Sequence, residues 1–233
     1  MRRRGWIVIA AVFLSCAWSV VSSLNGFLSL NRPVQAEVLI VESWLPDYAL
    51  QGALDEFRRG GYKHLIAAAS GLPGGWTGQS RYKTGAELTA ATLAALGLET
   101  NLIAVMPVSD VARDRTYSAA LGVKAWLESS DPAVRSVNLY SLGPHSRRSW
   151  LLYQTSFESQ VKPSASAALT SNPSPIGWER VAAGRVRVGV LAHPDDRYDP
   201  KRWWATSEGF QSVVGEAIAY LYARIFFHPP NTD

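Results

Sequence analysis

Short apolar runs, rich in β-branched residues, alternate along this chain with segments whose apolar positions recur every three or four residues. The short runs predict buried strands at 37–41, 65–69, 102–106, 137–142 and 186–191. The longer periodic segments predict helices at 46–60, 84–96, 114–128, 146–157 and 207–227. In the last of these, Phe210, Val213, Val214, Ala217, Ile218 and Leu221 form one apolar face.

Strands that alternate with helices predict a parallel sheet covered on both faces. The near-continuous apolar strands agree, because such strands are buried on both sides. We therefore expect an α/β fold: a three-layer Rossmann-like sandwich with a mainly parallel five-stranded sheet, preceded by one N-terminal transmembrane helix. Residues 1–32 would form the anchor and residues 33–233 a single domain, with irregular segments at 70–82 and 160–184.

The N-terminal segment has the length and composition of a membrane anchor. Residues 5–31 contain no charged side chain, and residues 5–24 alone span the roughly 30 Å of a bilayer's hydrocarbon core. Three arginines at 2–4 precede the segment and no basic residue follows immediately, which predicts an N-terminus inside the cell. We expect a single-pass protein of the inner or plasma membrane, with most of the chain extracytoplasmic.

Three alternatives compete with an uncleaved anchor. The apolar region is longer than the 7–15 residues of a signal peptide, but Val34-Gln35-Ala36 resembles a cleavage site. A lipoprotein site at Cys16 would follow Phe13-Leu14-Ser15, a poor match, and the apolar run continues beyond it. A buried core helix is disfavoured by the arginine cluster and the lack of helix caps.

The basic charge of the chain belongs to this anchor. The net charge is +4, and residues 1–32 contain four arginines and no acidic residue, so the rest of the chain has 19 basic and 19 acidic residues. A neutral domain gains no counterion-release energy on a polyanion, so nucleic acid is not an expected partner. The only cysteine is Cys16, which excludes an intrachain disulfide and a site built from several cysteines.

Polar residues follow the predicted strands directly, at positions that parallel strands bring to one edge of a sheet, where α/β proteins bind ligands. We predict Glu42 and His145 as catalytic residues. The ligand-binding candidates from the same edge are Ser43, Ser70, Gly71, Arg113, Asp114, Arg115, Thr116, Arg147, Arg148 and His193.

Each candidate has a chemical and a structural interpretation. Glu42 is either a buried acid poised for proton transfer or the partner of a nearby arginine. Asp114 either belongs to an anion site with its neighbouring arginines or caps a helix. His145 begins a helix, where free backbone N–H groups favour anions, or is an exposed loop histidine. We expect Arg113 or Arg115 beside His145 and Arg148, with Glu42 opposite and neither His145 nor Arg148 in the core.

No cofactor is indicated by a motif. The segment 193–199 contains histidine and aspartates without a familiar metal-ligand spacing, so no metal site is predicted. The chain lacks the glycine-rich dinucleotide and Walker motifs and the nucleophile elbow of α/β-hydrolases. Trp203-Trp204 could stack on a ligand, touch lipid headgroups or, more commonly for such a pair, belong to a core or a lid.

Several of these segments together resemble one family of bacterial proteins, the domain-of-unknown-function family that contains YdcF, SanA and ElyC. The resemblance covers roughly residues 37–192. It rests on Phe57-Arg-Arg-Gly-Gly-Tyr-Lys, Ala69-Ser70-Gly71, Asp114-Arg-Thr116 and, most specifically, Ser141-Leu-Gly-Pro-His145-Ser-Arg-Arg148. It adds Glu87, which stands where the family has a helical acid, to the ligand-binding candidates.

The resemblance implies a Rossmann-like domain, often membrane-anchored, with a role in envelope biogenesis, but no particular reaction. The chain departs from the family at Glu42-Ser43-Trp44, where a glycine-rich turn is common, and at Ala119, where asparagine is common. Two functions follow. One is binding or processing of an anionic small molecule or a phosphorylated, lipid-linked precursor, with Glu42 and His145 as acid/base groups. The other is a non-catalytic factor that binds a ligand or partner.

Overall fold

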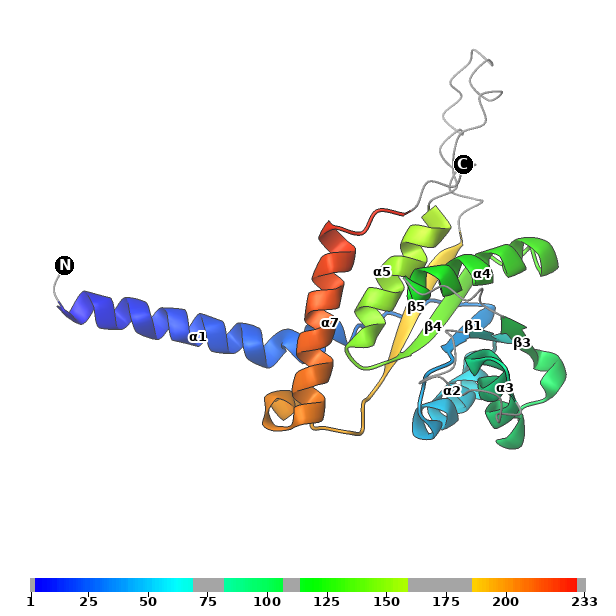
Figure 1. Ribbon diagram of the computed structural model, residues 1–233, viewed down its shortest axis with the longest axis horizontal. Helices are drawn as coiled ribbons and strands as arrows, with labels where there is room; N and C mark the ends of the chain where they lie inside the picture. Colours follow the sequence, from blue (N-terminus) through cyan, green and yellow to red (C-terminus); the bar gives the residue numbers. More distant parts are fainter. Residues whose placement is uncertain (1–2, 69–81, 107–113, 159–185, 230–233) are drawn as a thin grey trace, which may run out of the picture.

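The computed structural model describes residues 3–68, 82–106, 114–158 and 186–229, and these form one α/β domain behind a projecting N-terminal helix (Figure 1). The helices are α1 (Arg3–Leu28), α2 (Asp47–Gly60), α3 (Gly85–Ala95), α4 (Arg115–Ser130), α5 (His145–Glu158) and α7 (Ser207–Ile225), with 3₁₀ turns η1 (Thr100–Leu102) and η3 (Pro200–Ala205). The strands are β1 (Val38–Glu42), β2 (His64–Ala68), β3 (Ile103–Met106), β4 (Ser136–Leu142) and β5 (Arg187–His193).

The sheet has the order β3-β2-β1-β4-β5, and every pair of neighbouring strands is parallel. The predicted α/β sandwich is therefore confirmed, with a sheet that is wholly rather than mainly parallel. The chain fills one side of β1 with β2 and β3 and then crosses to the other side with β4 and β5. The strand order thus reverses between β1 and β4, which is where open α/β sheets form their ligand crevice.

Alternating side chains divide the core into two layers. Val38 and Ile40 pack with α4 and α5 on one face of the sheet. Leu39 and Val41 pack with α2 and α3 on the other. β1 is central and all five of its residues are buried, which explains why its sequence is apolar throughout until Glu42.

The element boundaries lie within a few residues of those predicted. β5 continues two residues beyond its predicted end, to His193, because that residue still pairs with Leu142 of β4. The two longest irregular segments predicted, 70–82 and 160–184, lie almost entirely outside the described residues.

The N-terminal helix is apolar and long enough to cross a membrane, with a mean hydropathy of 2.2 over its best window in Gly5–Leu28. The last turns of α1 contact the domain. Val21, Leu24 and Leu28 pack against Trp203 of η3 and Val213 of α7. Trp203 is therefore buried at this junction, and Trp204 meets Trp18 edge to face.

The chain that follows α1 is also pinned. Arg32 exchanges two backbone hydrogen bonds with Val190 of β5, at 2.8 and 3.1 Å. The side-chain amide of Asn138 bonds both the N–H and the carbonyl of Val34, at 2.9 and 2.8 Å. The segment between helix and sheet is thus held along its length, so α1 has a fixed position on the domain.

The last helix buries less than its pattern predicts. Val213 is buried and Val214 and Ala217 are partly buried, but Phe210, Ile218 and Leu221 are exposed. The apolar face is wider than the contact with α1, α5 and η3 can cover.

Leu39 tests the central position of β1, because its side chain has 0% exposure between the sheet and α2. We expect Leu39→Ala to lower the free energy of unfolding by about 2–5 kcal/mol, through lost burial and the cavity left behind. The matched control is Leu88→Ala on α3, where the side chain is 42% exposed and the change should be below about 0.5 kcal/mol. Denaturant unfolding of the detergent-solubilised full chain measures both. Equal effects would contradict a central β1.

Candidate functional site

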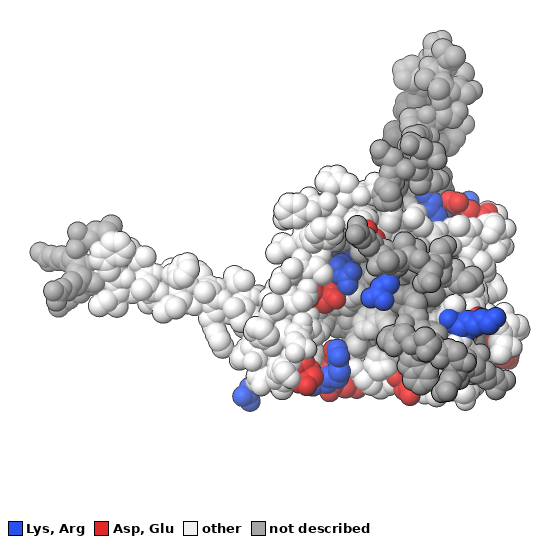
Figure 2. Space-filling model, viewed as in Figure 1, with Lys and Arg blue, Asp and Glu red and all other residues white. Residues whose placement is uncertain are grey.

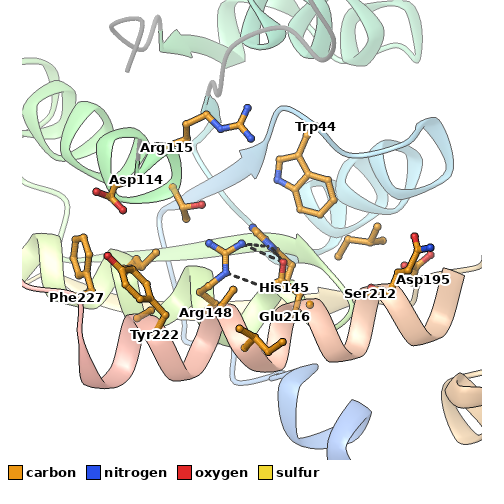
Figure 3. A pocket seen from close by; sticks show the side chains of 18 of the residues that line it. Trp44, Asp114, Arg115, His145, Arg148, Asp195, Ser212, Glu216, Tyr222 and Phe227 are labelled. Carbon is orange, nitrogen blue, oxygen red and sulfur yellow. Dashed lines mark hydrogen bonds and ion pairs between the residues drawn. The ribbon is translucent and has the colours of Figure 1, made fainter. Parts of the chain in front are cut away.

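A cleft of about 1150 Å³ lies over the carboxyl ends of β1 and β4, with α7 as one wall and the start of α4 opposite (Figure 3). Its polar lining includes Asp114, Arg115, Thr116, His145, Arg148, Asp195, Arg197, Glu208 and Glu216. Its apolar lining includes Trp44, Leu142, Leu152, Ile218, Ala219, Tyr222 and Phe227. The cleft therefore has a charged floor and an apolar flank along α7.

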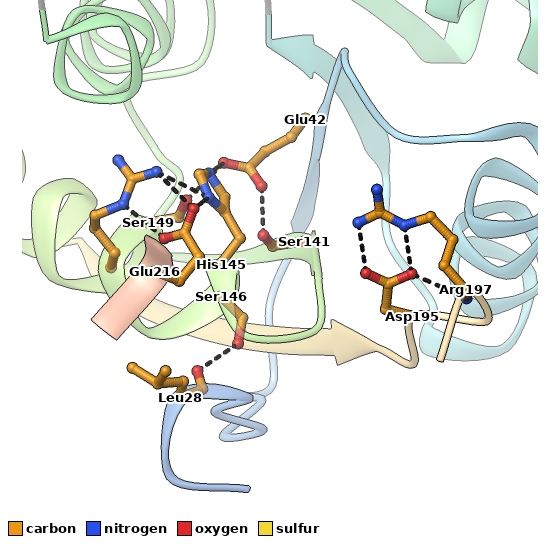
Figure 4. Close-up of polar contacts among 10 residues, drawn as sticks. Leu28, Glu42, Ser141, His145, Ser146, Ser149, Asp195, Arg197 and Glu216 are labelled. Atoms are coloured by element: carbon orange, nitrogen blue, oxygen red, sulfur yellow. Dashed lines mark hydrogen bonds and ion pairs between the residues drawn. The ribbon is translucent and has the colours of Figure 1, made fainter. Parts of the chain in front are cut away.

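Glu42 lies beneath this floor because of strand alternation. As the residue two after Ile40, it points to the face covered by α5, where Ser141 of β4 also points. Its side chain is buried, and its carboxylate accepts hydrogen bonds from the hydroxyls of Ser141 and Ser149, the latter at 2.7 Å (Figure 4). A buried carboxylate with two neutral donors still requires a positive partner.

His145 is that partner. It is the first residue of α5 and follows a tight turn in which Gly143 has a φ of 43°, a conformation that favours glycine. Its Nε2 lies 3.5 Å from Oε1 of Glu42, and its Nδ1 lies 2.8 Å from Oε1 of Glu216 on α7. The ring also meets the indole of Trp44 edge to face. The imidazole thus stands between two carboxylates from opposite ends of the chain.

Arg148 completes the cluster, one helical turn after His145. Its Nε donates to Oε2 of Glu216 at 2.8 Å and its Nη2 donates to Oε1 at 3.1 Å. Nη2 also lies 2.9 Å from Nδ1 of His145. When His145 is charged, its Nδ1 is a donor, as Nη2 of Arg148 always is. These two nitrogens therefore donate to Glu216 and do not bond each other.

The pKa values follow from burial opposed by charge. Burial alone would lower the pKa of His145, but the negative charges and hydrogen bonds of Glu42 and Glu216 raise it to about 9. Burial would raise the pKa of Glu216, but its bonds to His145 and Arg148 lower it to about 2. Burial acts in the same sense on Glu42, where the charge of His145 and the serine hydroxyls lower the pKa below its usual value. Near neutral pH, all three are charged.

These ionisation states define what the cluster can do. Glu42 and Glu216 are balanced by His145 and Arg148, so the four side chains have no net charge. Nδ1 of His145 is committed to Glu216, whereas its Nε2 is buried with no hydrogen-bond acceptor in suitable geometry. The ring is therefore held as a cation. In this arrangement neither of its nitrogens is free to take a proton from a ligand.

The opposite wall is provided by the start of α4. Arg115 is exposed, and in the described part of the chain its guanidinium has no hydrogen-bond or ion-pair partner. Asp114 precedes the helix at the N-cap position with a φ of 51°, but its side chain forms no capping hydrogen bond there. Thr116 also lines the cleft. Arg113, predicted beside them, lies outside the described residues.

A second charged pair stands at the far end of the cleft. Arg197 donates to both oxygens of Asp195, at 2.8 and 2.6 Å, and the hydroxyl of Tyr48 donates to the same carboxylate at 3.2 Å. Burial would raise the pKa of Asp195, but these bonds from Arg197 lower it. The carboxylate is already satisfied, which makes the pair part of the wall rather than a free acid.

The structure brings Glu42, His145 and Arg148 to one site, as predicted, but in a different arrangement. Glu42 lies against His145 rather than opposite it, and Arg115 lies across the cleft rather than beside His145 (Figure 3). A further expectation is also corrected. His145 is largely buried, with 13% of its side chain exposed, because both of its nitrogens are enclosed by carboxylates. Ser70 and Gly71 lie outside the described residues.

Four other candidates stand apart from the cleft lining. His193 points to the α2 face, where its Nδ1 lies 2.6 Å from the hydroxyl of Tyr140, because alternation along β5 puts it on the same side as Leu191. Arg147 stacks on the ring of Phe27 and bonds its carbonyl, which ties α5 to α1.

Ser43 and Glu87 have local structural bonds. Ser43 is buried, and both its N–H and its hydroxyl donate to the carbonyl of Ala68. Glu87 accepts the N–H of Lys83 at 2.6 Å, and its own N–H donates to the Thr84 hydroxyl at 3.2 Å. This pattern caps the start of α3 and differs from a standard capping box only in that Glu87 accepts from the residue before the N-cap.

Sequence reasoning missed Glu216. It lies between Val214 and Ala217 in a helix interpreted only by its apolar face. Its one available signal was its isolation, because an acid flanked by apolar residues on a packed helix requires a partner.

Within the described residues, no group of three or more histidine, cysteine, aspartate or glutamate side chains is arranged to hold a metal ion. No protein-family model matches this chain, and a search of curated proteins also found no match.

The raised pKa of His145 predicts a pH dependence of stability. The stabilisation is fully present below the unfolded pKa of 6.5 and is lost as pH rises through about 9. The free energy of unfolding of the detergent-solubilised chain should therefore fall between pH 6.5 and about 9. His145→Gln should flatten this fall, and His228→Gln, an exposed histidine near the C-terminus, should not. Glu42→Gln should also flatten it. Parallel curves for the wild type and both cluster variants would contradict a charged His145.

Proposed function

We propose that this chain is a membrane-anchored protein of envelope biogenesis that binds an anionic, phosphorylated and lipid-linked precursor in the cleft. The observation that carries the proposal is the division of the cleft into a charged floor and an apolar flank. Such a lining suits an amphiphile with a negative headgroup and an apolar chain.

The headgroup site is supported by one guanidinium without a partner among the described residues, that of Arg115, and by the remaining Nη1 donors of Arg148. Glu42 and Glu216 are neutralised by His145 and Arg148, and Asp195 is paired with Arg197, so these three acids add no net negative charge to repel an anion. Arg115 is unpaired in the described part of the chain, and Nη1 of Arg148 is not used by Glu216. Arginine presents forked donors that match phosphate oxygens and stays charged at any working pH.

A site for the apolar chain of the ligand is supported by the residues of α7 that face the cleft. Ile218, Ala219 and Tyr222 line it beyond Glu216, and Phe227 continues the same flank. An isoprenoid or acyl chain would cover these side chains. A small soluble anion would leave them exposed to water, which favours a lipid-linked ligand over a free one.

Binding is better supported than catalysis, because both imidazole nitrogens face carboxylates. One observation favours processing of the same ligand as a second function: Nε2 of His145 is buried without an acceptor. A headgroup oxygen that displaced the Trp44 ring would accept a hydrogen bond from that N–H. Phosphorus NMR of a polyprenyl pyrophosphate incubated with the wild type and with His145→Gln separates the two functions, since only processing produces a new His145-dependent signal.

The resemblance to the YdcF, SanA and ElyC family supports an envelope role through Ser141-Leu-Gly-Pro-His145-Ser-Arg-Arg148. The cleft is built around this segment, since Ser141, His145 and Arg148 all belong to the cluster. The arginines at 2–4, with no charged residue until Arg32, support an N-terminus inside the cell and a domain outside it.

Binding is tested with a polyprenyl phosphate and the uncharged polyprenol of the same chain length, each titrated into the detergent-solubilised chain. We expect a clear preference for the phosphate. Arg115→Gln should weaken phosphate binding about 10- to 150-fold, since one charge-assisted hydrogen bond contributes about 1.5–3 kcal/mol. The matched control is Arg187→Gln, an exposed arginine at the opposite end of β5. Equal affinity for the two lipids would contradict the headgroup site.

Topology is tested with a reporter fused after Asp233 that is active only outside the cytoplasm. We expect activity in the full chain and none when residues 2–28 are deleted, because the anchor carries the export signal. The product should stay in the membrane fraction at full length. A cytoplasmic signal, or a soluble product that begins near Glu37, would contradict the uncleaved anchor.

A further inference from the structure

The exposed side of α7 bears an apolar surface that the domain does not cover. Phe210, Leu221 and Ile225 are all exposed, none of them lines the cleft, and at 100° per residue they fall on one side of the helix. We refer to these three residues as the α7 stripe, which Ile218 and Tyr222 separate from the cleft. The charged residues of α7 are Glu208, Glu216 and Arg224, and the same geometry places all three outside the stripe.

α7 is therefore a helix with three different sides. One side, with Glu216, lines the cleft. A second, with Val213 and Ala217, packs against α1 and η3. The third is the α7 stripe. Figure 2 shows this part of the surface, between α1 and the cleft, as a continuous area without Lys, Arg, Asp or Glu, whereas charges gather inside the cleft and at the lower edge.

We propose that the α7 stripe rests in the outer interface of the same bilayer that α1 spans, an inference that relies on the membrane anchor of the proposed function. The occupant is lipid rather than a second protein because of the length of α1. Residues 5–20 are exposed, but contact with the domain already begins at Trp18, which meets Trp204.

The length of α1 free of the domain is too short to cross a membrane. Residues 5–17 rise about 20 Å at 1.5 Å per residue, whereas the hydrocarbon core is about 30 Å thick. Roughly seven more residues, 18–24, must lie within or at the edge of the hydrocarbon. Those residues are the ones that contact η3 and α7 through Val21 and Leu24. The anchor therefore cannot span the bilayer without bringing α7 to its surface.

The orientation and chemistry of the junction agree. α7 runs across the C-terminal end of α1 instead of along it, so it would lie along the membrane plane (Figure 1). The junction contains Trp18, Trp203, Trp204 and Tyr220, the residue types enriched at membrane interfaces. Lys201 and Arg202 are exposed on η3 beside them, where they suit the phosphates of lipid headgroups.

The test places a fluorophore on single cysteines in the full chain, reconstituted in vesicles that contain lipids with a spin label at shallow depth. Cys16→Ser removes the only native cysteine. Phe210→Cys and Leu221→Cys report on the α7 stripe without entering the cleft lining, and Leu88→Cys on α3 is the matched control, an exposed leucine distant from α1. We expect quenching at both stripe positions to exceed that at Leu88 by at least threefold, together with a blue-shifted emission.

Quenching at Phe210 and Leu221 no greater than at Leu88 would overturn the proposal. Disulfide or crosslinker-mediated pairing of Leu221→Cys chains without lipid quenching would also overturn it, and would identify a second copy as the occupant. No ligand is present in this experiment. If the stripe is quenched but the chain does not prefer polyprenyl phosphate over polyprenol, the ligand proposal fails while the membrane contact stands. A cytoplasmic or cleaved product in the topology test would remove the basis of both.

Discussion

The buried carboxylate of Glu42 is the constraint on which the arrangement of this domain depends. It stands at the end of the central strand, where only 5% of the residue is accessible to solvent, and an ionised acid there is stable only with a positive partner and satisfied oxygens. Ser141 and Ser149 satisfy the oxygens and His145 supplies the charge. Since those residues belong to β4 and α5, one acid fixes the strand crossover, the tight turn at Gly143 and the start of α5. Through His145, it also holds Glu216 and with it the last helix.

The sequence predicted the parts of this structure that follow from local periodicity. Five apolar strands alternating with helices lead to the parallel sheet, and the strand-end rule places Glu42 and His145 at one edge because parallel strands end together. The prediction was wrong about which face of the sheet some strand-end residues occupy. His193 ends β5 at the same edge, but lies on the α2 side with Tyr140, since the side to which a residue points depends on register and not on position along the edge. Glu216 was out of reach for a different reason: its place opposite His145 depends on how α7 docks, which only the tertiary structure determines.

The same distinction separates the two arginines that follow His145. Arg147 and Arg148 are adjacent in sequence and were equal candidates for the ligand site. On a helix, neighbours point about 100° apart, so Arg148 turns to Glu216 and the cleft while Arg147 turns to Phe27 of α1. Two adjacent residues of one motif therefore have different roles, Arg148 in the cleft and Arg147 in the attachment of α1 to the domain. A substitution of Arg148 would be expected to change ligand binding, whereas a substitution of Arg147 would be expected to loosen the contact between α5 and α1.

The attachment of α1 also has a consequence for how the domain meets other molecules. Many anchored domains swing on a flexible tether and sample a hemisphere of solution. Here three contacts hold the segment between α1 and the sheet in place. They are the Arg32–Val190 bridge, the hydrogen bonds of the Asn138 amide to Val34, and the packing of Leu28. With α1 in a bilayer, the mouth of the cleft would stay at one height and one tilt. A ligand embedded in the lipid would then always approach it from the same side. Only a ligand whose headgroup lies at that height would reach the cleft, whatever its chemistry.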